Sequence, residues 1–102
     1  MNPKYLRMIQ KMKKQGKREW SVYILRCGDG SLYTGIAKDV GARLEQHRKG
    51  KGAAYTRTHL PVDLIYQESR YSRSAALVRE ARVKRLPRPK KESLATSLSR
   101  IS

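Results

Sequence analysis

Two tyrosines in this very basic chain, Tyr23 and Tyr33, lie ten residues apart in β-forming segments, and Gly35 follows two residues after the second. A free tyrosine has a pKa of about 10, and a nearby cation would favour its phenolate and make it a competent general base. Tyr, Thr and Ile are also ordinary strand residues, so packing is the alternative role for both tyrosines. The residues alone do not decide which tyrosine would be the base.

The charge of the chain indicates its class of partner. The formal net charge is +16, from 24 Lys and Arg against 8 Asp and Glu. Such a field attracts polyanions, so nucleic acid is the expected partner, although RNA and DNA are not distinguished by charge. The alternative is a soluble basic protein without a polyanionic partner. A membrane is not expected, because the sequence has no long apolar segment.

The cysteine and histidine content excludes some classes of site. Cys27 is the only cysteine, and His47 and His59 are the only histidines. Three such residues are too few for a structural zinc site, and no intramolecular disulfide can form. With no secretory signal, the sequence predicts a reducing, cytoplasmic location.

The spacing of the two tyrosines depends on a hairpin at Asp29-Gly30, which lies between two β-forming runs. A two-residue loop would pair Arg26 with Tyr33 and place the two tyrosines on opposite faces. A three-residue loop, or a bulge at Gly30, would pair Leu25 with Tyr33 and place both rings on one face. If the tyrosines cooperate, the loop must therefore be odd or bulged.

The remaining pattern predicts an α+β domain at 20–102 in the order β-β-α-β-α-α, after a basic N-terminal extension at 1–19 that is helical or poorly ordered. Asp39 is the expected cap of a helix that carries Arg43 and His47 one turn apart. The expected elements are strands at 20–27, 32–36 and 62–68, a loop at 50–61, and helices to about 49, at 72–86 and from 88. In the third strand, Val62, Leu64 and Tyr66 alternate and are expected on one face.

The stretch SVYILRCGDGSLYTGIAKDVGARLEQH resembles the GIY-YIG nuclease family, in particular its small stand-alone bacterial branch. Residues 21–23 stand where that family has Gly-Ile-Tyr, and residues 33–35 where it has Tyr-Ile-Gly. Arg43, His47 and Glu80 are similar in position to the arginine, histidine and metal-binding glutamate of the family. The resemblance extends over roughly residues 20–95.

This resemblance implies a metal-dependent DNA endonuclease with a three-stranded antiparallel sheet flanked by helices. It makes Tyr33 the better candidate for the base, with Tyr23 bonded to a metal-bound water. Arg43 would hold the phosphate, and His47 would orient a tyrosine or share the base role. Gly35 would let the nucleic-acid backbone or the next helix approach, unless it is only a strand-end glycine.

Glu80 is the expected ligand of one Mg²⁺ or Mn²⁺ ion. The eight carboxylates include no pair that resembles a two-metal site, and a single Glu with waters and phosphate suits Mg²⁺. The alternative is an exposed glutamate paired with Lys84. No small-molecule cofactor is expected. The candidate contacts to nucleic acid are Lys38, Lys49, Lys51, Tyr55 and Arg57, with solvated loop charge as the alternative.

Two departures from the family pattern bear on activity. Many members carry an asparagine near the end of the domain, but the only asparagine here is Asn2. Ile36 follows Gly35 where excision-repair relatives have lysine. The alternative function is therefore a catalytically weak or inactive basic module that has the same fold and binds nucleic acid.

Overall fold

The computed structural model describes residues 19–101, with side chains as far as Thr96. Three strands, β1 (Trp20–Cys27), β2 (Leu32–Ala37) and β3 (Val62–Tyr71), form an antiparallel sheet in the order β2-β1-β3. This confirms the predicted α+β class. The extension at 1–19, apart from Glu19, and Ser102 lie outside the described residues.

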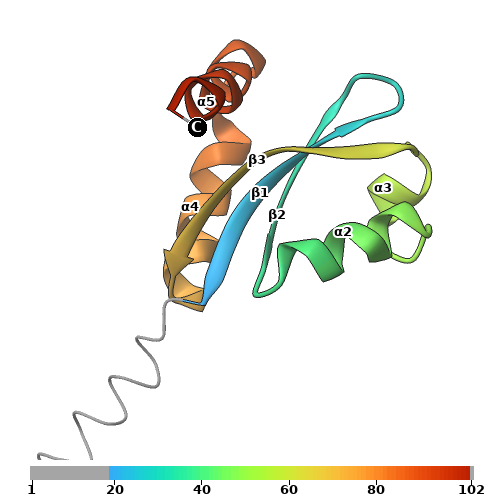
Figure 1. The fold of residues 1–102 in the computed structure, drawn as a ribbon, viewed down its shortest axis with the longest axis horizontal. Coiled ribbons are helices and arrows are strands. Elements are labelled where there is room, and N and C mark those ends of the chain that lie inside the picture. Colours follow the sequence, from blue (N-terminus) through green and yellow to red (C-terminus); the bar gives the residue numbers. More distant parts are fainter. Residues whose placement is uncertain (1–18, 102) are drawn as a thin grey trace, which may run out of the picture.

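Helices cover both faces of the sheet (Figure 1). The helices α2 (Val40–Arg48) and α3 (Ala54–Arg57) lie on one side, and α4 (Arg73–Arg85) and α5 (Arg88–Ile101) on the other. Alternation along the strands divides the buried side chains into two cores. The α2 core contains Tyr23, Leu25, Cys27, Ala37, Val40 and Val62, and the α4 core contains Val22, Ile24, Tyr66, Ala76 and Val83. No helix within residues 19–101 has both the length and the hydrophobicity that are needed to cross a bilayer.

The hairpin between β1 and β2 has a three-residue loop. Cys27 N donates to Ser31 O at 2.8 Å, and Gly30 N donates to Cys27 O at 2.9 Å. Gly30 has a φ of 85°, which an L side chain rarely adopts and which glycine adopts without strain. Leu25 therefore pairs with Tyr33. This confirms the odd loop that cooperation of the two tyrosines requires.

The predicted helix starts are confirmed, but the loop at 50–61 is not entirely irregular. The Asp39 carboxylate accepts from Ala42 N at 3.0 Å and caps α2. Ser72 caps α4 in the same way through Ala75 N at 3.1 Å. Within the predicted loop, Ala54–Arg57 form the four-residue helix α3. A single turn is too short for hydrophobic periodicity to reveal.

The prediction that Val62, Leu64 and Tyr66 share one face is wrong. Leu25 pairs with Leu64 and Ile24 pairs with Tyr66, so Ile65 is an extra residue in a β-bulge. Val62 therefore packs in the α2 core and Tyr66 in the α4 core, while Leu64 is exposed.

The end predicted for this strand is also too early. A second irregularity, at Arg70 with a φ of 72°, lets β3 continue beyond Glu68 as far as Tyr71, which pairs with Trp20. Positive φ is uncommon for a residue other than glycine, so no sequence pattern indicates a strand that continues through an arginine in this conformation.

Candidate active site

Tyr23 and His47 form a buried pair on the side of the sheet that α2 covers. Tyr23 Oη lies 2.9 Å from His47 Nε2, and the two side chains are 1% and 0% exposed. His47 Nδ1 lies 2.7 Å from Thr56 Oγ1, which donates its only proton to Ala53 O at 2.9 Å. Thr56 must then accept from Nδ1–H, which leaves Nε2 to accept from the Tyr23 hydroxyl. The hydrogen bonds thus fix one neutral tautomer of His47.

Two glycines make room for this pair. Gly35 lies opposite Tyr23 in the sheet, and a Cβ on Gly35 would lie 2.6 Å from Tyr23 Oη and 2.7 Å from Cζ. The nearest group within the protein is thus the phenol of Tyr23, which is a reason for glycine that was not expected from the sequence. The expected approach of a nucleic-acid backbone stays a prediction. A Cβ on Gly52 would overlap the imidazole of His47.

Tyr33 is the more accessible of the two tyrosines. It is half-buried, and its ring centroid lies 6.4 Å from that of Tyr23 and 5.4 Å from that of His47. Burial raises the pKa of Tyr33, the charge of Arg43 opposes this rise, and the Glu80 carboxylate adds to it. Tyr33 is thus a neutral phenol at neutral pH unless further positive charge arrives.

Tyr23 is held even more strongly as a neutral phenol. Burial, followed by the proximity of Tyr33, raises the pKa of Tyr23 to about 12, and Arg43 opposes the rise. The Tyr23 hydroxyl is also committed to His47. Accessibility and electrostatics therefore both favour Tyr33 as the tyrosine that can meet a substrate.

Arg43 and Glu80 reach the tyrosines from different helices. Arg43 is half-buried on α2, and its Nη1 donates to Gln46 Oε1 at 2.8 Å. Its charge acts on both tyrosines, and it lowers the pKa of His47 after the larger effect of burial. Glu80, on α4, raises the pKa of both tyrosines, so its carboxylate is electrostatically close to them. The structure thus brings together the five side chains that the sequence singled out.

Arg79, beside Glu80 in the chain, ties α4 to the sheet. Its guanidinium donates to the Glu68 carboxylate on β3, which also accepts from the hydroxyls of Tyr66 and Tyr71. Burial raises the pKa of Glu68, but the hydrogen bonds and the charge of its partners outweigh burial and lower this pKa overall. The bond from Arg79 is the largest of these lowering effects. This cluster fixes α4 on its face of the sheet and so determines where Glu80 is presented.

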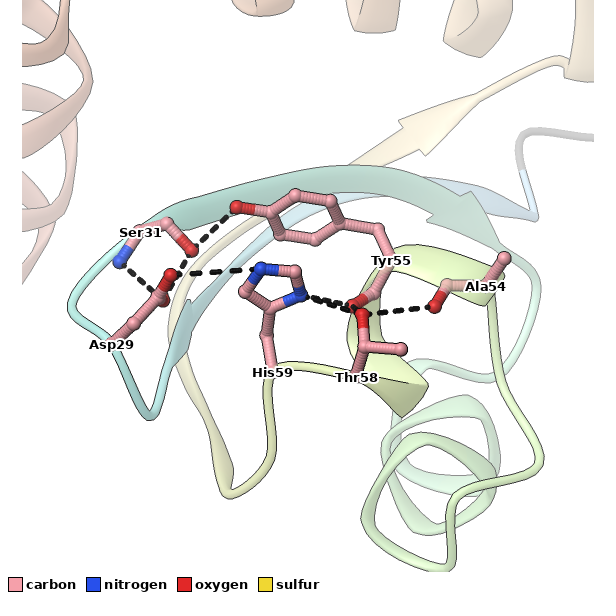
Figure 2. Close-up of polar contacts among 6 residues, drawn as sticks. All are labelled: Asp29, Ser31, Ala54, Tyr55, Thr58 and His59. Carbon is pink, nitrogen blue, oxygen red and sulfur yellow. Dashed lines mark hydrogen bonds and ion pairs between the residues drawn. The ribbon is translucent and has the colours of Figure 1, made fainter.

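A second polar network joins the hairpin loop to α3 (Figure 2). The Tyr55 hydroxyl donates to Ser31 Oγ at 2.7 Å, and Ser31 Oγ donates to Asp29 Oδ1 at 2.6 Å. The bonds from Ser31 lower the pKa of Asp29. His59 stacks on Tyr55, with ring centroids 4.0 Å apart, and its Nε2 lies 3.6 Å from Asp29 Oδ2. These contacts hold α3, and therefore Thr56, against the hairpin loop that joins β1 to β2.

The candidate contacts to nucleic acid differ in how close they lie to the two tyrosines. Tyr55 is 41% exposed and lies beside the site, with its ring centroid 6.3 Å from that of Tyr33. Lys38 is exposed and its Nζ lies 3.6 Å from Glu19 Oε2. Lys49, Lys51 and Arg57 are exposed, so solvated charge remains the alternative for these three.

Sequence reasoning missed the residues that orient His47. Thr56 and Gly52 contact the imidazole from a segment that was expected to be irregular. No periodicity marks them, because a contact between a helix and a later loop depends on the tertiary fold. The one available signal was the combination of a small residue and a hydroxyl residue shortly after a helix that carries a histidine.

A divalent ion would find one carboxylate at this site. Within residues 19–101, no three His, Cys, Asp or Glu side chains gather as a metal cluster. Glu80 lies 3.7 Å from Lys84 Nζ, which is the helix pair expected as the alternative, and its side chain remains 19% exposed. A single carboxylate fits Mg²⁺, which commonly retains waters and takes further oxygens from substrate phosphate.

Thr56→Val is expected to release the tautomer of His47. The substitution removes the acceptor of Nδ1–H, and an unsatisfied buried donor costs about 1–3 kcal/mol. Histidine ¹⁵N chemical shifts would then show loss of the pure Nδ1–H form, and urea unfolding would show the lower stability. Thr56→Ser retains the hydroxyl and should restore the tautomer. Identical histidine spectra in wild type and Thr56→Val would contradict this assignment.

The buried His47 should make stability depend on pH below its ordinary pKa. Burial and Arg43 depress its folded pKa below 6.5, so the unfolded chain binds more protons. This contribution to the free energy of unfolding is complete above about pH 6.5 and is lost as pH falls towards the folded pKa. Urea unfolding over this range should show the loss, and His47→Gln should remove it. An unchanged slope in His47→Gln would assign the effect to other groups.

Comparison with known proteins places these observations in a family. Residues 19–93 match the GIY-YIG catalytic domain. A UPF0213 protein of Staphylococcus aureus strain Mu3 is 56% identical over 70 residues, which cover 69% of this chain and 85% of that protein. A solution structure of an E. faecalis protein is 37% identical, with a TM-score of 0.54 over 83% of this chain and 91% of that one.

A UPF0213 protein from Bacillus halodurans, also solved in solution, is 45% identical over 76% of this chain and 82% of its own, with a TM-score of 0.48. None of these three names states an activity. The domain match nevertheless covers most of the chain, including the segments that carry both tyrosines, Arg43, His47 and Glu80. This chain therefore belongs to the GIY-YIG family, a family of nucleases that act on nucleic acids.

Proposed function

We propose that this protein is a metal-dependent endonuclease that hydrolyses phosphodiester bonds in DNA. The observation that carries the proposal is the convergence of Tyr33, Arg43 and Glu80 around the buried Tyr23–His47 pair. These side chains come from β2, α2, α4 and β1. The rings of Tyr23, Tyr33 and His47 lie against one another, and the charges of Arg43 and Glu80 shift the pKa of both tyrosines. The net charge of +16 attracts the polyanionic substrate.

Each side chain has a distinct task in this reaction. Tyr33, as its phenolate, accepts the proton of the attacking water, because it is the more accessible phenol and the charge of Arg43 opposes the rise in its pKa that burial causes. Arg43 donates to a non-bridging phosphate oxygen and stabilises the charge that develops there. Tyr23, locked to His47 Nε2, supports the ring of Tyr33. A divalent ion on Glu80 would supply positive charge to the phosphate and offset the carboxylate that raises the pKa of Tyr33.

Cleavage assays with a carboxylate variant test this proposal. Supercoiled, branched and single-stranded DNA are incubated with the full chain, with Mg²⁺ or Mn²⁺ and with a chelator. Nicking is expected with metal only, and Glu80→Gln should lose it. Glu92→Gln is the matched control, because Glu92 instead pairs with Arg26 and Arg88.

The same assays separate the enzyme from the alternative function. Salt-sensitive binding to all three DNAs with no metal-dependent cleavage would contradict the endonuclease and favour a basic module that only binds nucleic acid. Equal nicking by Glu80→Gln and wild type would contradict the role given to Glu80.

A further inference from the structure

We propose that a groove beside Arg43 is a subsite for one nucleobase of the bound strand. The groove lies where β2 ends and α2 begins, and its volume is about 530 Å³. Its apolar wall is formed by Trp20, Ile36, Ala37 and Ala42. This inference rests on the proposed function only in taking nucleic acid as the ligand.

The position of the groove connects it to the candidate active site. Arg43 lines the groove and also acts on Tyr33, so a phosphate held by Arg43 would have its neighbouring nucleotide at the mouth of the groove. Among residues 19–101, β2 is an edge strand of the sheet and has no further strand beside it. A strand of nucleic acid can therefore pass from Tyr33 along β2 towards Trp20.

The chemistry of the walls matches a base and its phosphates. The Trp20 indole and Ile36 offer apolar surface, and stacking on an aromatic ring binds any base. Lys38 Nζ lies 5.8 Å and Arg73 Cζ 5.7 Å from the centroid of the Trp20 ring. Both cations lie over the Trp20 ring, so a base that stacks on the indole would displace one of them, and the displaced cation can meet a phosphate of the bound strand.

The groove also contains an acidic group, but that group has another task. Asp39 lines the groove, and its carboxylate accepts from Ala42 N as the cap of α2. Gln46, also on the wall, accepts from Arg43. Lys38 also pairs with Glu19 Oε2 at 3.6 Å. The three cations Arg43, Lys38 and Arg73 exceed the two carboxylates, Asp39 and Glu19, by one charge, which favours an anionic ligand with a flat apolar part.

Trp20 is the only tryptophan, so its fluorescence reports on the groove. We expect a short thymidine oligonucleotide to quench it saturably in the full chain without metal. An abasic oligonucleotide of equal length and charge should bind, as followed by anisotropy of a label, with far less quenching. Equal quenching by both oligonucleotides at saturation, or no quenching by either, would overturn the base subsite.

A variant that fills the groove tests the same site without removing Trp20. Ala42→Leu places a larger side chain on the wall without changing charge, and should weaken thymidine binding about tenfold. Ala75→Leu is the matched control, because Ala75 holds the same position after the cap of α4 that Ala42 holds in α2. Equal affinity of the two variants would contradict the subsite.

These binding measurements need no turnover, so they separate the two proposals. Base-dependent quenching in a protein that cleaves no DNA would support the subsite and contradict the proposed nuclease activity. Metal-dependent nicking without base-dependent quenching would support the nuclease and overturn the subsite.

Discussion

Tyr33→Phe is expected to lower metal-dependent nicking by about 10²–10⁴-fold, the usual contribution of a general base. The substitution removes only the hydroxyl, and the ring keeps its packing against Tyr23 and His47. Rates are measured on supercoiled plasmid across a pH series. In the wild type the rate should rise with pH, because burial raises the pKa of Tyr33 and its phenolate is scarce at neutral pH.

The control for this variant is Tyr55→Phe. It removes a neighbouring hydroxyl that donates to Ser31 and helps to hold α3, but that has no part in proton transfer in the proposed reaction. Tyr55→Phe should therefore lower the rate less than Tyr33→Phe and keep the same pH dependence. If Tyr33→Phe cleaved at the wild-type rate while His47→Gln did not, the base would instead be the Tyr23–His47 pair.

Gly35→Ala is the second change with a large expected effect. The new methyl group would lie 2.6 Å from Tyr23 Oη, and Tyr23 is fully buried and cannot move aside. Overpacking of this kind costs about 1–3 kcal/mol of stability, and displacement of the hydroxyl would break its bond to His47. Urea unfolding measures the first effect, and the ¹⁵N shift of His47 Nε2 measures the second.

Gly41→Ala is the matched control for this glycine. Its new Cβ would have Asp39 Oδ1 as its nearest neighbour at 3.4 Å, and alanine in a helix is favoured over glycine by up to about 1 kcal/mol. Gly41→Ala should therefore be neutral or stabilising. Equal stability of Gly35→Ala and wild type would show that Tyr23 has room that the packing does not indicate.

The parts of the site that follow local rules could be predicted from the sequence. Asp39 as a cap and the turn at Gly30 depend on neighbours within a few residues, and both are as expected. The requirement that Tyr23 and Tyr33 share a face limits the hairpin to a three-residue loop or a bulge, and the structure has the three-residue loop. The general type of fold followed because each strand and long helix had its own periodic pattern.

The support of His47 could not be predicted in this way. Thr56 and Gly52 meet the imidazole only after α3 packs against the β1–β2 hairpin, and this packing depends on the network of Tyr55, Ser31 and Asp29. The orientation of Tyr66 was hidden by a bulge that adds one residue without any signal from glycine or proline. Both failures concern contacts that a local pattern does not encode.

The bulge at Ile65 makes the length of β3 as important as its composition. Val62 and Tyr66 are buried in opposite cores only because one extra residue, Ile65, lies between them and has no partner in β1. Deletion of Ile65 would remove the bulge and leave Val62 opposite Cys27 and Tyr66 opposite Ile24, each in its present core. Loss of this one codon during evolution would thus keep the two faces of the strand, whereas loss of a second codon beside it would exchange them for half of the strand.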